Sequence, residues 1–396
     1  MKRVFSFCLV LVVVLGMPFF TNAAPDDWTE LSEVEDVMPM SSAGTLGGGC
    51  AATILMECAT GKVLFESNAD EKLPIASVTK VMTLLLVAEA LDSGQISKED
   101  MVTVSENAAS KGGSQIYLEV GERMSVHELL KAVVVASAND GAVALGEFVA
   151  GSEELFVAQM NARAKVLGLE VSFVNPTGLD DEACHTLSAR DVAIISRELL
   201  SHSWIREYST IWMDSVRGGA FGLTNTNRLV RFYEGTTGLK TGSTSKAKYC
   251  ISASAERGGM ELIAVVLGGE SSDRRFSAAK ELFDYGFANY AIYQPVGADF
   301  EPIRVFGGKQ MSVTPSLRAE GILVQKSQVT RITEEVRLPQ TLMAPVEEGQ
   351  TVGEIVYCLD GKEVVRHPVL ATGDVERVDF VFLFFRLLSR AFLGSA

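Results

Sequence analysis

Three short segments of the chain carry residue types that could do chemistry together. Ser77-Val-Thr-Lys80 pairs a hydroxyl with an amine, Ser137-Ala-Asn139 adds a second hydroxyl and an amide, and Lys240-Thr-Gly242 adds a cation. A serine made nucleophilic by a neighbouring base is a common device for acyl transfer. The additional cation indicates a substrate that ends in a free carboxylate.

The first segment stands at the start of a helix that the sequence predicts from Val81 to Leu91. This stretch is apolar around nearly its whole circumference, which is typical of a helix buried on all sides. Ser77 and Lys80 are three residues apart and so share one helical face. Because apolar surroundings disfavour an ammonium ion, we expect the pKa of Lys80 to fall and its amine to act as a base. The other Ser-x-x-Lys matches in the chain lack so apolar a helix.

The second segment follows the apolar run Val133–Ala136 and precedes the turn-forming pair Asp140-Gly141. Alone, such a polar triplet is typical of a helix C-terminal cap. Beside the other two segments, we interpret it as a projection into a cleft. Ser137 would relay a proton between Lys80 and the leaving amine, and Asn139 would hold the amide backbone of the substrate.

The third segment lies within Gly238–Thr244, just before a predicted hairpin, and is therefore expected on the edge of a sheet. Its small residues would let a substrate approach closely and pair as an added strand. Lys240 and Thr241 would bind the terminal carboxylate. The backbone N–H groups of Ser243 and Ser77 would form an oxyanion hole. A plain glycine-rich turn is the alternative interpretation.

The N-terminus resembles an export signal followed by a tail. Residues 1–23 have a basic start, an apolar run at Leu9–Leu15 and small residues before a predicted cleavage site. Gly16 and Pro18 interrupt this short apolar stretch, which argues against a membrane-spanning anchor. We therefore expect an exported protein. Residues 24–50 carry six acidic and no basic side chains, which predicts a disordered extension.

The rest of the chain changes character twice. Between residues 51 and 290 strands precede helices and strands follow them, which predicts a mixed α+β domain with an antiparallel sheet and a helical region. Residues 295–370 contain short runs of Val, Ile and Thr, with a hairpin signal at Asp360-Gly361, and predict a small all-β domain. Residues 374–396 predict an amphipathic helix that is too short to span ~30 Å of hydrocarbon comfortably. We expect it to lie on a membrane surface, and packing onto the β domain is the alternative.

Charge and metal-binding residues limit the classes of function. The formal charge of the 396 residues is −15, which makes nucleic acid a poor partner. Six cysteines and four histidines show no metal-ligand spacing, and His127-Glu-Leu-Leu-Lys131 lacks the second histidine of a zinc peptidase. We therefore predict no metal, no cofactor and no disulfide framework.

Together the three segments resemble those of the serine D-alanyl-D-alanine carboxypeptidases, the low-molecular-mass penicillin-binding proteins of peptidase family S11. The resemblance also includes Ala59–Glu66, Asn175–Leu179 and His185–Asp191, and it covers roughly residues 51–396. It implies a penicilloyl serine transferase (β-lactamase-like) domain at the extracytoplasmic face of a bacterial membrane. Ser77 would be acylated by the penultimate D-alanine of a peptidoglycan stem peptide, and the terminal D-alanine would be released. β-Lactams would act as covalent inhibitors.

Other polar residues near these segments have narrower expected roles. The resemblance implies that Arg275, at the start of a predicted helix, helps to bind the substrate carboxylate, although the adjacent Arg274 is also a candidate. Ser188 and Asp191 match a helix capping box. His185 is interpreted as structural, because chemistry based on Ser and Lys does not need it.

Three alternatives keep the same segments but change the activity. A β-lactamase would need a glutamate that activates water, and residues 175–182 lack the expected Glu-x-x-x-Asn pattern. A D,D-endopeptidase that cuts cross-linked peptidoglycan would use the same site with a different cleft. A catalytically silent wall-binding protein would have lost Ser77 or Lys80, and both are present.

Overall fold

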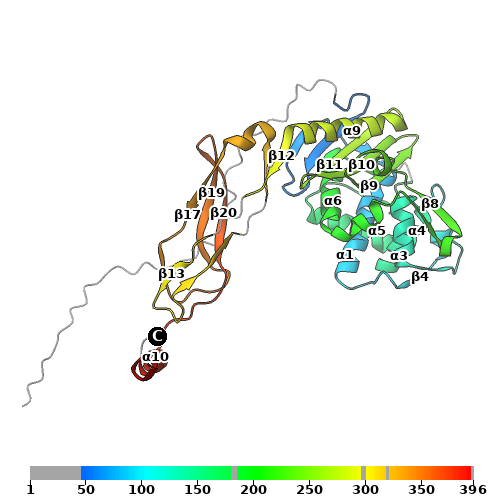
Figure 1. The fold of residues 1–396 in the computed structure, drawn as a ribbon. Coiled ribbons are helices and arrows are strands. Elements are labelled where there is room, and N and C mark those ends of the chain that lie inside the picture. The colour runs from blue at the N-terminus through cyan, green and yellow to red at the C-terminus, as the bar shows by residue number, and fades with distance from the viewer. Residues whose placement is uncertain (1–45, 180–184, 296–299, 318–320, 394–396) are drawn as a thin grey trace, which may run out of the picture.

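The computed structural model describes residues 46–179, 185–295, 300–317 and 321–393 (Figure 1). The predicted export signal and residues 24–45 of the predicted extension lie outside these ranges. Residues 46–50 form a turn, in which the Gly47 N–H donates to a carboxylate oxygen of Glu281 (3.2 Å). The described fold therefore begins at residue 46 rather than at residue 51.

A five-stranded antiparallel sheet forms the centre of the first domain. Its strands lie in the order β2-β1-β11-β10-β9. Their bounds are β1 (Ala52–Glu57), β2 (Val63–Ser67), β9 (Thr236–Thr244), β10 (Lys248–Arg257) and β11 (Met260–Gly269). The hairpin predicted after Gly238–Thr244 is confirmed as β10–β11, and β1 and β2 form a second hairpin. β9 is an edge strand, so the segment Lys240–Gly242 lies where the sequence placed it.

Helices cover both faces of this sheet (Figure 1). α9 (Ser272–Asn289) packs on one face and buries Phe283 against β10 and β11. α6 (Ala189–Ser201) packs on the other face and contacts α1 (Lys80–Asp92). A 3-10 turn, η1 (Ala76–Thr79), leads directly into α1, whose side chains are almost all buried, as predicted. The mixed α+β fold is confirmed.

The remaining helices build a region beside the sheet. α3 (Val126–Val135) packs on α4 (Asn139–Ala150), and α4 also contacts α1. The other elements of this domain are α2 (Glu106–Ala109), α5 (Glu153–Val166), α7 (Arg206–Ser209), α8 (Leu229–Phe232), η2 (Ser203–Ile205), η3 (Arg217–Gly219) and the strand pairs β3–β6 (Leu73–Pro74, Thr186–Leu187), β4–β5 (Met101–Thr103, Arg123–Ser125) and β7–β8 (Met213–Val216, Phe221–Thr224).

The second domain, here called the β domain, is built around its own apolar core. Its longest strands, β19 (Thr351–Leu359) and β20 (Lys362–Ala371), form the hairpin predicted at Asp360-Gly361. The other elements are β12 (Tyr290–Tyr293), β13 (Ile303–Phe306), β14 (Ser312–Val313), β15 (Pro315–Leu317), β16 (Ile322–Gln325), η4 (Lys326–Arg331), β17 (Ile332–Arg337) and β18 (Thr341–Met343).

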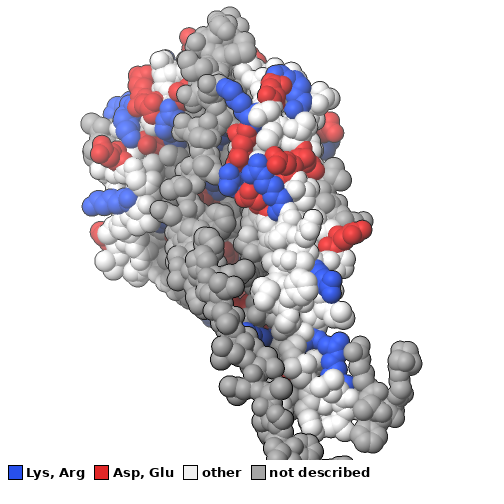
Figure 2. All heavy atoms as spheres, turned by 90° about the vertical axis from the view of Figure 1, so that its left-hand side faces the viewer, with Lys and Arg blue, Asp and Glu red and all other residues white. Residues whose placement is uncertain are grey.

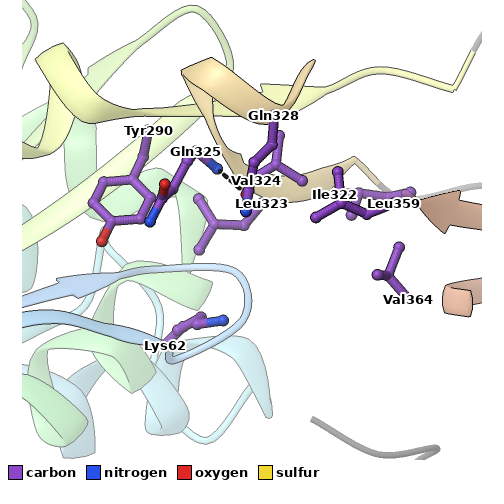
Figure 3. A pocket seen from close by; sticks show the side chains of 9 residues that line it. All are labelled: Lys62, Tyr290, Ile322, Leu323, Val324, Gln325, Gln328, Leu359 and Val364. Carbon is purple, nitrogen blue, oxygen red and sulfur yellow. Dashed lines mark hydrogen bonds between the residues drawn. The ribbon is translucent and has the colours of Figure 1, made fainter. Parts of the chain in front are cut away.

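The two domains meet at the C-terminal end of α9. β12 continues directly from α9 and pairs with β16, and the Lys326 amine donates to the Phe287 carbonyl (2.6 Å). Figure 3 shows a narrow cavity at this junction, with Lys62 from the β1–β2 turn on one side and Leu359 and Val364 on the other. The β domain therefore extends away from the end of a helix of the first domain (Figure 1).

The C-terminal helix α10 (Phe380–Leu393) lies at the far end of the β domain (Figure 1). Several of its apolar side chains are exposed: Phe380 is 81% exposed, and Phe384, Phe385 and Leu387 are also exposed. Phe382 is partly buried and lies under the Lys309 amine of the β domain. Within the described ranges, no helix is long and apolar enough to cross a lipid bilayer. On the face drawn in Figure 2, acidic and basic side chains lie beside one another rather than in separate regions, as expected from ion pairs such as Arg331–Asp360.

Candidate active site

Ser77 and Lys80 face each other across the junction of η1 and α1. The Lys80 Nζ atom lies 3.0 Å from the Ser77 Oγ atom. The three-residue spacing brings the two side chains onto one face, because the 3-10 turn continues directly into the helix. The Lys80 side chain is fully shielded from solvent. This pair has the geometry of a nucleophile and its base.

Lys80 has two further acceptors in the site. Its Nζ atom donates to the Asn139 Oδ1 atom (2.6 Å) and to the Thr177 carbonyl oxygen (2.9 Å). Burial lowers the pKa of Lys80 from its usual 10.5 to about 7, while the nearby charge of Asp140 acts in the opposite direction. A neutral Lys80 amine can donate to Asn139 and Thr177 and still offer its lone pair to the Ser77 hydroxyl. The predicted fall in the Lys80 pKa has this physical cause.

The second segment joins α3 to α4, and its Asn139 side chain reaches Lys80. Ser137 is buried, and its backbone is in the left-handed region (φ 63°) at this junction. Asn139 is the first residue of α4, and its Nδ2 atom donates to the Gly112 carbonyl (2.7 Å). Both ends of the Asn139 amide thus bind protein groups in this structure. Its first role here is to hold Lys80, and binding of a substrate amide stays a prediction.

The third segment approaches Ser77 from the edge strand β9. A Cβ atom on Gly242 would lie 2.7 Å from the Ile75 carbonyl oxygen and 2.8 Å from the Ser77 nitrogen. Only glycine leaves β9 room to lie this close to η1. Ser243, the next residue, is exposed on the strand edge. The strand therefore brings the predicted oxyanion donors, the N–H groups of Ser77 and Ser243, to one part of the molecule.

Lys240 and Thr241 are buried beside this contact. The Lys240 Nζ atom donates to the Thr241 carbonyl oxygen (2.8 Å), and the Thr241 hydroxyl donates to the hydroxyl of Thr226 (2.8 Å). Burial, reinforced by the positive charges of Lys80 and Arg275, holds the pKa of Lys240 well below its usual range. An anion that entered the site would relieve this repulsion between cations, so the arrangement is suited to a carboxylate.

The structure distinguishes the two adjacent arginines at the start of α9. Arg275 is buried, and its Nη1 atom donates to the carbonyls of Gly242 (3.0 Å) and Cys250 (3.3 Å). Burial lowers the pKa of Arg275 to about 10. Arg274 instead forms an ion pair with Glu281 (2.7 Å). Arg275 is therefore the arginine that reaches the predicted carboxylate site.

A loop that sequence reasoning did not place in the site completes it. The Asn175 Oδ1 atom accepts hydrogen bonds from the N–H groups of Thr177 (3.0 Å) and Gly178 (2.7 Å), and this turn presents the Thr177 carbonyl to Lys80. Gly178 has a positive φ of 69°, and a Cβ atom there would overlap the Ala76 carbonyl. The turn-forming sequence Asn-Pro-Thr-Gly was the available signal. Residues 180–184, which include part of the segment searched for a β-lactamase glutamate, lie outside the described residues.

The polar residues with expected structural roles also have clear positions. The ring of His185 lies against η1, with its Nε2 atom 3.1 Å from the Thr79 hydroxyl. Ser188 and Asp191 form the predicted capping box at the start of α6. Thr237 donates to the Glu261 carboxylate (2.7 Å) at the start of β9.

Comparisons with known proteins agree with this geometry. Residues 48–271 match the family model described as D-alanyl-D-alanine carboxypeptidase, and residues 291–377 match that of the penicillin-binding protein 5 C-terminal domain. The chain is 39% identical to the D-alanyl-D-alanine carboxypeptidase DacF of Bacillus subtilis, over 96% of each chain. It is 36% identical to DacC of Escherichia coli, over 83% of this chain and 85% of the relative. The crystal structure of penicillin-binding protein 5 from Haemophilus influenzae superposes with a TM-score of 0.68 at 31% identity, over 83% of this chain and 98% of that one.

Proposed function

The chain belongs to the D-alanyl-D-alanine carboxypeptidase family S11, and from this premise we propose how its own residues carry out the reaction. It is a serine-type D-alanyl-D-alanine carboxypeptidase, a penicillin-binding protein that acts on peptidoglycan peptides. We assign the nucleophile to Ser77, the base to Lys80 and the proton relay to Ser137. Lys240, Thr241 and Arg275 would recognise the substrate carboxylate.

Acylation begins with neutral Lys80. Its Nζ atom takes the proton of the Ser77 hydroxyl, 3.0 Å away, as the Ser77 Oγ atom attacks the carbonyl carbon of the penultimate D-alanine. The N–H groups of Ser77 and Ser243 stabilise the negative oxygen that develops. The proton then passes through Ser137 to the leaving amine, the C–N bond breaks and the terminal D-alanine departs. A water molecule hydrolyses the ester and restores the Ser77 hydroxyl.

Recognition of the substrate is local, because the net charge of −15 repels anions at long range. Lys240 and Arg275 place buried basic groups beside the edge of β9, and no carboxylate among the described residues shifts their pKa values. A peptide that ends in a free carboxylate would neutralise this charge. The peptide backbone would run along the edge of β9, where Ser243 is exposed. These features favour cleavage next to a free C-terminus.

The observation that carries the assignment is the contact between Ser77 and a fully buried Lys80 whose pKa lies at about 7. An ordinary surface lysine would be protonated near neutrality and could not accept the serine proton. The same pair would open the strained amide of a β-lactam and leave a penicilloyl ester on Ser77.

The test is the mass of the purified protein after brief exposure to benzylpenicillin. We expect one penicilloyl adduct, and digestion should locate it on the peptide that contains Ser77. Ser77→Ala should keep the fold and lose the adduct. Adduct formation on Ser77→Ala would overturn the assignment of the nucleophile. Release of D-alanine from a linear pentapeptide should be lost in the same variant.

We further propose that the mature protein is anchored at the extracytoplasmic membrane surface through α10. The support is an apolar helix at the end of the β domain on which Phe380, Phe384 and Phe385 are exposed. Arg386 on the same helix is suited to lipid phosphates. Sedimentation with anionic lipid vesicles tests this proposal. The full mature chain should sediment with the vesicles, and a chain ending at residue 378 should stay in the supernatant. Equal sedimentation of both would contradict it.

A further inference from the structure

Asp140, the residue after Asn139, is a fully buried acid that the reaction above does not use. Its carboxylate accepts hydrogen bonds from the backbone N–H groups of Ile116 (3.1 Å), Leu118 (3.0 Å) and Gly141 (2.9 Å). It also lies in the first turn of α4, where the helix dipole favours a negative group. Burial of an acid is costly unless such partners compensate for the lost water. The molecule thus supports a buried carboxylate beside its catalytic lysine.

The loop that surrounds Asp140 also holds Asn139. The Ser114 carbonyl accepts the Asn139 backbone N–H (2.7 Å), and the Gly112 carbonyl accepts the Asn139 side-chain amide (2.7 Å). This second bond fixes which end of the amide faces Lys80, so that the Oδ1 atom accepts from the Nζ atom. Residues 112–118 therefore connect the buried acid to the orientation of the lysine's partner.

A single arginine holds this loop from its other side. The Arg217 guanidinium, on η3, donates to the carbonyls of Ile116 (2.8 Å) and Tyr117 (3.2 Å) and forms an ion pair with Glu122 (2.7 Å). Its own backbone N–H donates to Glu128 (2.8 Å), which ties η3 to α3. Ile116 thus donates its N–H to Asp140 and accepts from Arg217 through its carbonyl.

The charges around Asp140 fall on two sides. On the side of the active site are Lys80 from α1 and, beyond it, Lys240 from β9 and Arg275 from α9. On the side of the loop is Arg217, whose own neighbours are Glu122 and Glu119. Within the described residues, Asp140 is the one carboxylate whose charge raises the pKa of Lys80. Its charge is therefore placed between the catalytic cation and an outer cation.

We propose that Asp140 and Arg217 are positioning residues that set the pH range in which Lys80 works as a base. The negative charge of Asp140 stabilises the Lys80 ammonium, and the positive charge of Arg217 on the far side of the loop offsets part of this effect. The same two side chains hold the 112–118 loop and so keep the Asn139 Oδ1 atom on Lys80. This inference rests on the proposed role of Lys80.

The test measures the rate of acylation by benzylpenicillin from pH 5 to 10 in variants of the full mature chain. Asp140→Asn removes the negative charge, so the acid limb of the profile should move to lower pH by on the order of one unit. Arg217→Gln removes the offsetting charge, so its acid limb should move to higher pH, by a smaller amount because it lies farther away. Arg217→Lys keeps the charge but loses the planar guanidinium group that donates to the carbonyls of Ile116 and Tyr117. It should keep the acid limb of the wild type and lower the plateau rate.

Arg190→Gln is the matched control. Arg190 is also a partly exposed arginine of the first domain that pairs with carboxylates, Glu66 and Asp70, and it takes no part in the site. Its profile should match that of the wild type. Two results would overturn the proposal and leave these residues with only a structural role. In the first, the acid limb moves in the same direction in Asp140→Asn and Arg217→Gln. In the second, both variants lose plateau rate while the acid limb stays where it is in the wild type.

Two outcomes separate this inference from the proposed function. If the wild type formed no adduct on Ser77, the proposed function itself would fail. If Asp140→Asn did not fold, the two Arg217 variants would be sufficient to test the proposal. They are expected to fold, because Arg217 is partly exposed and its replacement leaves no buried cavity. An unmoved acid limb in Arg217→Gln would then contradict the proposal.

Discussion

Lys80, Lys240 and Asp140 are almost wholly shielded from solvent in the first domain, whereas the ion pairs of the β domain, such as Arg366–Glu363, remain about one-third exposed. Both domains have ordinary apolar cores, so they differ in whether their ionisable side chains are buried or exposed. Burying an ion costs several kcal/mol even after relaxation. Exposed pairs avoid that cost and contribute little.

This contrast identifies which domain carries the chemistry. The first domain buries two lysines whose pKa values are lowered, and we propose that they supply a base and a carboxylate site near neutral pH. The β domain has no comparable group among its described residues, and its shape carries the exposed α10 away from the first domain (Figure 1). We therefore expect the β domain to hold the first domain at a distance from α10 and to take no part in the reaction.

The sharpest way to break this comparison is Lys80→Met. Methionine matches the length of the buried lysine stem but cannot accept a proton. We expect acylation of Ser77 by benzylpenicillin to slow by about 10²–10⁴-fold, the usual contribution of a general base. Stopped-flow or quenched mass measurements would follow the adduct. An unchanged rate would show that another group removes the serine proton. The burial of Lys80 in the first domain would then not explain the reaction.

A core substitution in the β domain tests whether this domain contributes to stability without contributing to the reaction. Ile355→Ala empties a fully buried position on β19 and should lower the free energy of unfolding by about 2–5 kcal/mol. The acylation rate of Ser77 should stay at the wild-type value wherever the protein remains folded. Chemical denaturation followed by fluorescence gives the first quantity, and penicilloyl labelling gives the second. A large loss of acylation in the folded variant would mean that the β domain takes part in the reaction.

The dependence of acylation on pH should reflect the buried lysine. Because the folded-state pKa of Lys80 is about 7, the neutral base is scarce below that pH and dominant above it. The acylation rate should therefore rise about tenfold per pH unit below pH 7 and level off above it. Rapid labelling with benzylpenicillin across buffers of constant ionic strength would trace the curve. A midpoint near the usual lysine value of 10.5 would show that Lys80 is solvated in solution.

The smallest effect is expected for an exposed pair. Arg366→Ala removes the contacts with Glu363 (2.6 Å) and Glu354 (3.4 Å) on the surface of the β domain. The change in the free energy of unfolding should be below about 1 kcal/mol and should shrink further in high salt. Denaturation in low and high salt measures both values. A loss comparable to that of Ile355→Ala would mean that the pair is far less hydrated than its exposure indicates.

Much of the site could be predicted because its residues lie in short sequence patterns that indicate their local structure. The apolar sequence of α1 indicated that Lys80 is buried. The small residues around Lys240-Thr indicated a close approach by a substrate, and at Gly242 the structure shows a close approach by η1 instead. Hairpins and the capping box follow from turn and cap residues that act over a few positions. These signals need no knowledge of the tertiary fold.

The features that sequence reasoning missed depend on contacts between distant segments. The Thr177 acceptor is a backbone carbonyl, which every residue carries, so no residue type marks it. The choice between Arg274 and Arg275 depends on the rotation of α9 over the sheet. The contact of the Asn139 Oδ1 atom with Lys80 depends on the hydrogen bond from the other end of the amide to the Gly112 carbonyl. Packing decides each of these points.

Gly178 has an evolutionary consequence. At this position the chain has a left-handed backbone and lies directly on the Ala76 carbonyl, so any side chain would displace the turn that holds Lys80. A mutation to glutamate here would damage acylation before it could supply a water-activating group. A lineage under selection by penicillins would have to acquire a hydrolytic acid at another position, or reduce acylation itself. The backbone thus restricts which routes to drug resistance are open to this enzyme.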